Sequence, residues 1–96
     1  MRKYELMTIY PIKDEKYNAG LETLKADLAN FGVEIEKEEP FGERDLTYEV
    51  KKNKKGKFLL LHIKANPAKI SEMDVKFKLN ENLLKYMFVL KEDQEA

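Results

Sequence analysis

The feature that most constrains the fold is the order in which two hydrophobic periodicities follow each other along the chain. Residues 3–10 alternate with the period of two that is typical of a strand, and Pro11 ends this run. Apolar side chains then recur every three or four residues up to Phe31. This spacing predicts a helix with Asp14 as its N-terminal cap and Gly32 as its C-terminal cap.

The middle of the chain returns to the period of two. Residues 33–50 alternate, and an interruption at residues 40–42 predicts one long strand with a bend or a bulge. Residues 51–57 are polar and contain five lysines, an asparagine and a glycine, which predicts the tip of a hairpin. Residues 58–65 then form the returning strand.

A second helix and a last strand complete the pattern. Asn66 followed by Pro67 is typical of a helix start, and residues 83–90 form the final strand. The order predicts an α+β domain of the ferredoxin-like βαββαβ type, a four-stranded antiparallel sheet with two helices on one face. Residues 1–91 make up this single domain, and residues 92–96 form a charged tail that we expect to be flexible.

Composition excludes several classes of function. Eighteen Lys and Arg residues balance eighteen Asp and Glu residues, so RNA binding would require local patches of charge. The chain has no cysteine, no signal sequence and no apolar run of membrane-spanning length, so we expect a soluble intracellular protein without membrane contacts.

Catalytic motifs are missing from the sequence. The only histidine, His62, lies within a predicted strand, and we interpret it as a strand residue. There is no glycine-rich phosphate loop or His-Glu metal motif, and the loop after Tyr10 has no arginine of the kind that acylphosphatases use. We therefore predict no enzyme activity, cofactor, metal or small-molecule substrate.

Three predicted strands are apolar on both faces, as Leu59 and Leu61 against Phe58 and Leu60 illustrate. Two helices cover only one face of the sheet, so apolar side chains remain on the other face. They indicate either a surface for a partner or the ordinary apolar content of central strands. The acidic second strand and the hairpin lysines leave similar alternatives open. Each is either a contact for a charged partner or a solvated surface.

Four segments carry a resemblance to a known family: residues 1–6 (MRKYEL), 41–48 (FGERDLTY), 56–58 (GKF) and 77–86 (FKLNENLLKY). In this order they resemble the bacterial small-subunit ribosomal protein S6 family over nearly the whole chain. The resemblance implies a ferredoxin-like fold and a place in the cytoplasmic ribosome. It also implies joint binding, with ribosomal protein S18, to the central domain of small-subunit RNA, in support of platform assembly and translation.

The resemblance and the side-chain chemistry together predict two sets of contacts. Arginine leads the RNA set because its planar fork suits phosphate. The predicted RNA contacts are Arg2, Lys3, Tyr4, Arg44, Lys85 and Lys91. The predicted partner contacts are Ile35, Phe41, Leu46, Tyr48 and Val50. The isolated chain is expected to be a monomer.

Two other functions fit the same element order. A ferredoxin-like regulatory or scaffold domain would form oligomers through its sheet face. An RNA recognition motif would carry stacking aromatics on its third strand, but leucines occupy most of those positions in residues 58–61. The size of the protein in solution separates the scaffold from the ribosomal function.

Overall fold

The protein is described by a computed structural model that covers residues 1–91. Six main elements follow one another in the predicted order. They are β1 (Arg2–Tyr10), α1 (Asp14–Asn30), β2 (Glu34–Val50), β3 (Asn53–Ala65), α2 (Ile70–Lys78) and β4 (Lys85–Leu90), with a 3-10 turn at Pro67–Lys69 before α2. The predicted tail, residues 92–96, lies outside the described residues.

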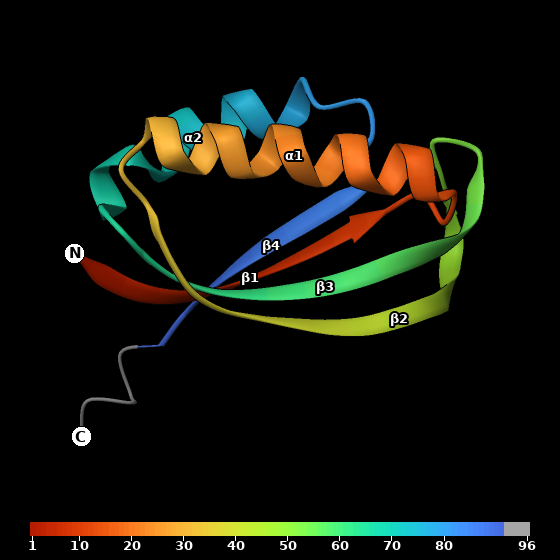
Figure 1. Ribbon diagram of the computed structural model, residues 1–96, viewed down its shortest axis with the longest axis horizontal. Coiled ribbons are helices and arrows are strands. Elements are labelled where there is room, and N and C mark those ends of the chain that lie inside the picture. The colour runs from red at the N-terminus through yellow and green to blue at the C-terminus, as the bar shows by residue number, and fades with distance from the viewer. Residues whose placement is uncertain (92–96) are drawn as a thin grey trace.

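The four strands form one antiparallel sheet in the order β2-β3-β1-β4. Both helices lie on the same face of this sheet, and the other face is left uncovered by them (Figure 1). This arrangement confirms the predicted ferredoxin-like fold. No helix within residues 1–91 is long and apolar enough to cross a membrane.

The core lies between the helices and the sheet. In β1, Leu6 lies opposite Leu61 of β3 on one side and opposite Phe88 of β4 on the other. Leu24 of α1 and Phe77 of α2 are buried against this layer. Each fully buried side chain of this size contributes about 1.5–3 kcal/mol relative to its exposed state, so the core fixes which face of every strand points towards the helices.

The ends of α1 agree with prediction at one end only. Gly32 has a φ of 71°, and its amide donates to the carbonyl of Ala29 over 3.0 Å, as expected for a C-terminal cap. The prediction of Asp14 as N-terminal cap was wrong. Lys13 occupies the cap position, and Asp14 is the first helical residue, with its carboxylate 3.2 Å from the ammonium of Lys57.

The β2–β3 hairpin is tighter than predicted. Its turn is formed by Lys51 and Lys52, with φ values of 49° and 68°, the backbone expected of a two-residue turn with two left-handed positions. Residues 53–57 belong to β3 and pair with β2, so the prediction of a tip over residues 51–57 was wrong. The reason is that lysine stems can lie along a strand while their ammonium groups reach water.

The predicted irregularity of β2 is confirmed. The register between β2 and β3 shifts at three places, between residues 35 and 37, 40 and 42, and 45 and 50. The last strand begins at Lys85 and not at Leu83. The amide of Leu83 donates to the carbonyl of Asn80 over 3.2 Å, so Leu83 still belongs to the turn that follows α2.

Candidate binding surfaces on the open sheet face

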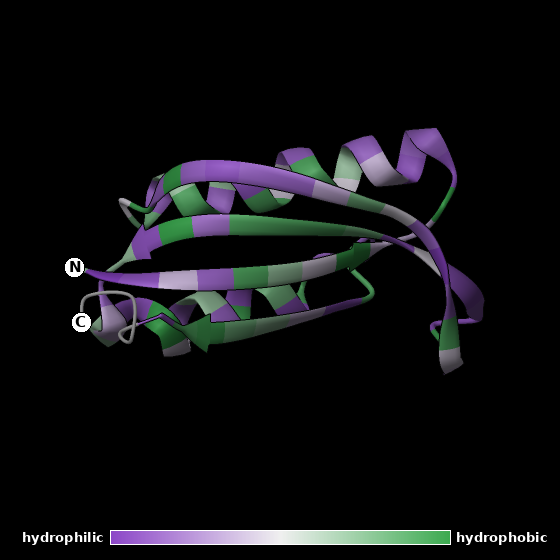
Figure 2. Ribbon diagram, turned by 90° about the horizontal axis from the view of Figure 1, so that it is seen from below, coloured by the Kyte–Doolittle hydropathy of each residue, from purple (hydrophilic) through white to green (hydrophobic). Residues whose placement is uncertain are grey.

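The open face of the sheet carries apolar side chains from three strands, β1, β3 and β4. They alternate with the buried residues and therefore point away from the helices. They are Met7, Ile9, Phe58, Leu60, Met87 and Val89. Figure 2 shows this face, with hydrophobic stretches along β1, β3 and β4 and a mainly hydrophilic β2. The predicted surplus of apolar surface on this side is confirmed.

An apolar groove of about 310 Å³ lies where residues 46–50 of β2 pass over this face. Its lining residues come from four strands: Met7, Ile9, Leu46, Thr47, Tyr48, Val50, Phe58, Lys85, Tyr86 and Met87. Tyr48 is 67% exposed and Met87 is 58% exposed, so these two side chains present large apolar surfaces to solvent. Three predicted partner residues, Leu46, Tyr48 and Val50, thus meet in one groove.

Gly56 brings the two walls of this groove together. A Cβ atom at this position would lie 2.4 Å from Cγ2 of Ile9 and 3.4 Å from Cδ2 of Leu46. Only a residue without a side chain permits such an approach. Gly56 therefore allows Leu46 to come down onto the sheet beside Ile9.

The other two predicted partner residues lie elsewhere. Ile35 packs against the core on the helix side of β2, so its side chain is not part of the open face. Phe41 is 42% exposed and lies beside Arg44, whose guanidinium carbon is 6.0 Å from the centre of the ring. The structure therefore does not bring Ile35 and Phe41 into the groove.

A cationic depression of about 490 Å³ lies at the opposite end of the sheet. It is lined by Arg2, Lys3, Lys64 and Lys91, together with Met1, Leu90 and one carboxylate, Glu34. The amide of Lys91 donates to the carbonyl of Lys3 over 3.0 Å, which joins the end of β4 to the start of β1. Three predicted RNA contacts, Arg2, Lys3 and Lys91, are thus neighbours.

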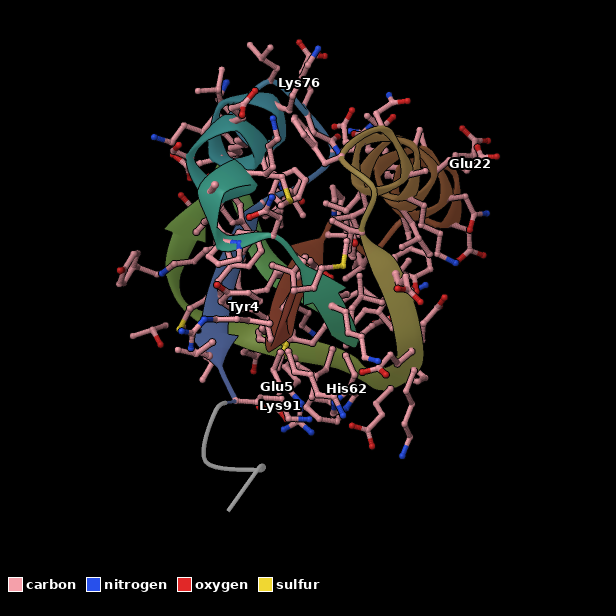
Figure 3. The ribbon with its side chains drawn as sticks, turned by 90° about the vertical axis from the view of Figure 1, so that its left-hand side faces the viewer. Tyr4, Glu5, Glu22, His62, Lys76 and Lys91 are labelled. Carbon is pink, nitrogen blue, oxygen red and sulfur yellow. The ribbon has the colours of Figure 1, made fainter. Side chains whose placement is uncertain are left out.

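His62 links Lys91, at this end of the sheet, to Glu39 of β2 through polar contacts. Its Nδ1 atom lies 3.1 Å from the ammonium of Lys91, and its Nε2 atom lies 2.7 Å from a carboxylate oxygen of Glu39. Figure 3 shows Glu5, His62 and Lys91 together below the sheet, away from the helices. The ammonium can only donate, so this geometry fits a neutral ring that accepts at Nδ1 and donates from Nε2 to Glu39. That donation lowers the pKa of Glu39.

The remaining predicted RNA residues do not join the cationic depression. Tyr4 is only 8% exposed and packs edge-to-face on Phe88, with ring centres 6.0 Å apart, which leaves little of its surface for RNA. This burial disfavours Tyr4 as an RNA contact, which stays a prediction. Lys85 lies in the apolar groove, with its ammonium 5.6 Å from the centre of the Tyr48 ring.

Three acidic residues in the first part of β2, Glu36, Glu38 and Glu39, are engaged within the chain. The carboxylate of Glu38 is 2.8 Å from the ammonium of Lys25, and that of Glu36 is 3.6 Å from the ammonium of Lys64. Pairs of this kind on a surface contribute little to stability, but they offset the negative charge of the strand. This favours the solvated acidic surface over a dedicated contact for a basic partner.

One pair of side chains with shifted pKa values lies between α2 and β4. The hydroxyl of Tyr86 donates to the carboxylate of Asp74, and burial followed by this contact raises the pKa of Tyr86 to about 12. The same hydrogen bond is the main cause that lowers the pKa of Asp74. No group of three or more His, Asp or Glu residues within residues 1–91 could hold a metal.

The fold and these surfaces define a small ferredoxin-like binding domain. A family model described as ribosomal protein S6 matches residues 3–90. The small ribosomal subunit protein bS6 of Treponema denticola is 52% identical over 93 residues, which cover 97% of this chain and 100% of that protein. The protein of the same name from Halalkalibacterium halodurans is 38% identical over 95 residues, which cover 97% of this chain and 100% of that protein. This chain belongs to the ribosomal protein S6 family.

Solved structures agree on the fold. Ribosomal protein S6 from Thermotoga maritima superposes with a TM-score of 0.83 at 22% identity, over 98% of this chain and 91% of that chain. The C-terminal domain of MgtC from Mycobacterium tuberculosis gives a TM-score of 0.64 at 10% identity, over 96% and 89%. Family membership confirms the predictions that the chain is a ribosomal protein, works in the cytoplasmic ribosome and is not an enzyme.

Proposed function

We propose that this protein binds the central domain of small-subunit ribosomal RNA together with ribosomal protein S18, and so supports platform assembly and translation. The observation that carries the proposal is the open sheet face. It has an apolar groove at one end and a cationic depression at the other. One face can thus accept a protein and RNA side by side.

The apolar groove supplies the means of holding a protein partner. Exposed aromatic and methionine side chains in a concave surface are typical anchors of protein interfaces, and Tyr48 and Met87 have this character. The outer edge of β2 lies next to the groove and offers backbone groups to which an extended segment can add. S18 would therefore lie across the groove and along β2.

The cationic depression supplies the means of holding RNA. Arg2 and Lys3 can reach phosphate oxygens, and phosphate contacts position an RNA without reading its sequence. The chain has a formal net charge of zero, so its own long-range attraction for RNA is weak. We expect S18 to provide most of the phosphate attraction, and RNA binding to need both proteins.

The test is binding of the full chain to a central-domain RNA fragment, with and without S18, over a series of salt concentrations. Arg2→Ala should weaken RNA binding about tenfold and reduce the salt slope by about one. Tyr48→Ala should weaken S18 binding about tenfold, the loss expected for an aromatic anchor. Two exposed residues on the helix side provide matched controls, Lys76→Ala in α2 for charge and Leu79→Ala directly after α2 for apolar surface, and neither should change binding.

Two results would contradict the proposal. Tight, specific binding of RNA without S18 would show that the chain does not depend on a joint surface. Stable self-association through the open face, with no binding of RNA in either case, would favour the scaffold function. A monomeric chain recruited into a complex only when S18 and RNA are both present supports the proposal.

A further inference from the structure

A second cationic depression, of about 360 Å³, lies at the other end of β1. Its charged lining comes from the start of α1 and from the β2–β3 hairpin, which rises beside that helix (Figure 1). The lining residues are Lys13, Lys16, Lys52, Lys54 and Lys55, with Pro11, Ile12 and Asn53. No carboxylate lines this depression, whereas Glu34 lines the one at the opposite end.

Within the part of the chain that the structure describes, the five lysines are not paired with carboxylates. Within residues 1–91 none of them has a carboxylate within 4.0 Å of its ammonium. The nearby Asp14 is engaged by Lys57, at 3.2 Å, and the neighbouring lysine of the turn, Lys51, donates to the carbonyl of Leu83 over 3.1 Å. The positive charge is therefore concentrated here, although the whole chain is neutral.

The chemistry of the lining selects the ligand. Lysine ammonium groups are flexible point charges that suit the spaced oxygens of a phosphate backbone more than one small shaped anion. No aromatic residue lines the depression, so it has no means of stacking a base. The expected ligand is therefore a sugar-phosphate backbone bound without sequence preference.

We propose that this lysine depression is a second contact for RNA phosphates, separate from the depression that contains Arg2 and Lys3. This inference rests on the proposed RNA binding and extends it to a new site. Residues 4–10 of β1 lie between Lys3 of the first depression and Pro11 of the second, which at ~3.3 Å per residue separates the two by roughly 26 Å. One folded RNA would contact both ends of the domain, and this would fix its orientation on the domain.

The test compares two triple variants of the full chain. Lys52→Gln, Lys54→Gln and Lys55→Gln together remove three charges from the lysine depression. Lys69→Gln, Lys76→Gln and Lys78→Gln together remove three charges from the region of α2, away from both depressions. Glutamine keeps most of the side-chain length, and thermal unfolding checks that each variant folds.

Binding to the central-domain RNA fragment in the presence of S18 is then measured over a salt series. The lysine-depression variant should reduce the slope of log K against log salt by about two, because each phosphate contact to RNA contributes roughly 0.7 to 0.9. The control should leave the slope unchanged. If the wild-type chain binds RNA and both variants keep its slope, the second site is overturned and the proposed function stands. If the wild-type chain fails to bind RNA with S18, both are overturned.

Discussion

Replacing Gly20 by alanine tests whether packing or helix propensity governs the middle of α1. A Cβ atom on Gly20 would lie 2.4 Å from the carbonyl oxygen of Asn82 and 3.0 Å from its carbonyl carbon. The obstacle is backbone and cannot rotate away. Because non-bonded heavy atoms prefer separations of about 3.5 Å, α1 and the connection from α2 to β4 would have to move apart by roughly 1 Å.

This movement would also loosen a buried hydrogen bond, in which the side-chain amide of Asn80 donates to the carbonyl of Gly20 over 3.0 Å. Overpacking of this kind costs about 1–3 kcal/mol, and the weakened hydrogen bond adds about 1 kcal/mol. Alanine returns about 1 kcal/mol through its higher helix propensity. We therefore expect Gly20→Ala to lower the free energy of unfolding by about 1–3 kcal/mol.

Urea denaturation followed by far-UV circular dichroism measures this difference. Ala19→Gly is the matched control, because Ala19 is exposed in the same helix and should lose only the propensity difference of about 1 kcal/mol. A Gly20→Ala variant as stable as the wild type, or more stable, would show that the approach of Asn82 does not limit this position and would refute the reasoning.

Three further predictions concern single contacts. The pKa of Tyr86 is raised to about 12 from an ordinary value of 10.0. The protonated hydroxyl therefore contributes to the free energy of unfolding, fully below pH 10, and this contribution is lost as the pH rises through 12. The free energy of unfolding should therefore fall less steeply between pH 10 and 12 in Tyr86→Phe, as urea midpoints would show, and NMR titration should find the pKa of Asp74 nearer its ordinary range. In His62→Ala the pKa of Glu39 should rise towards its ordinary value, because the donor that lowers it is removed, and carboxyl NMR titration measures this. In the wild type, the contribution of Glu39 to the free energy of unfolding is present at pH values above its ordinary pKa. It is lost as the pH falls through the lowered pKa. Lys52→Gly should raise the free energy of unfolding by about 0.5–1 kcal/mol, since glycine adopts a positive φ without strain, and chemical denaturation checks this.

The fold could be predicted from the sequence because its signals are local. Periods of two and of about 3.6 identify strands and helices without knowledge of the tertiary structure. The errors occur where tertiary contacts decide. Residues 53–57 have the composition of a turn, but their pairing with β2 makes them strand. Leu83 and Leu84 have the composition of a strand, but they turn into the core before β4 begins.

The binding surfaces were only partly predictable. Leu46, Tyr48 and Val50 share one face of a strand by alternation, so the sequence grouped them correctly, although the opposite wall of the groove depends on the register. The burial of Tyr4 could have been predicted, because it alternates in phase with Leu6, which is in the core.

The contact between His62 and Glu39 could not be predicted, because it depends on a bulge. Ile35 pairs with Ile63, and the next pair joins Lys37 to His62, so Glu36 is the additional residue in β2. The shift places Lys37 and Glu39 on the open face beside His62. A pattern of alternating residues gives no sign of where such an extra residue lies.

The distribution of charge and apolar surface would separate the two proposed binding steps. A partner seated in the groove buries mainly apolar side chains such as Tyr48 and Met87, and this interaction is insensitive to moderate salt. RNA held at the two lysine- and arginine-lined ends of β1 releases counterions, so its affinity falls steeply as salt rises. The chain is neutral overall, so its attraction for RNA depends on such local groups of lysine and arginine. Raising the salt should therefore strip RNA from a ternary complex before it releases S18, whereas simultaneous loss of both would mean that the protein partner, too, is held by charge.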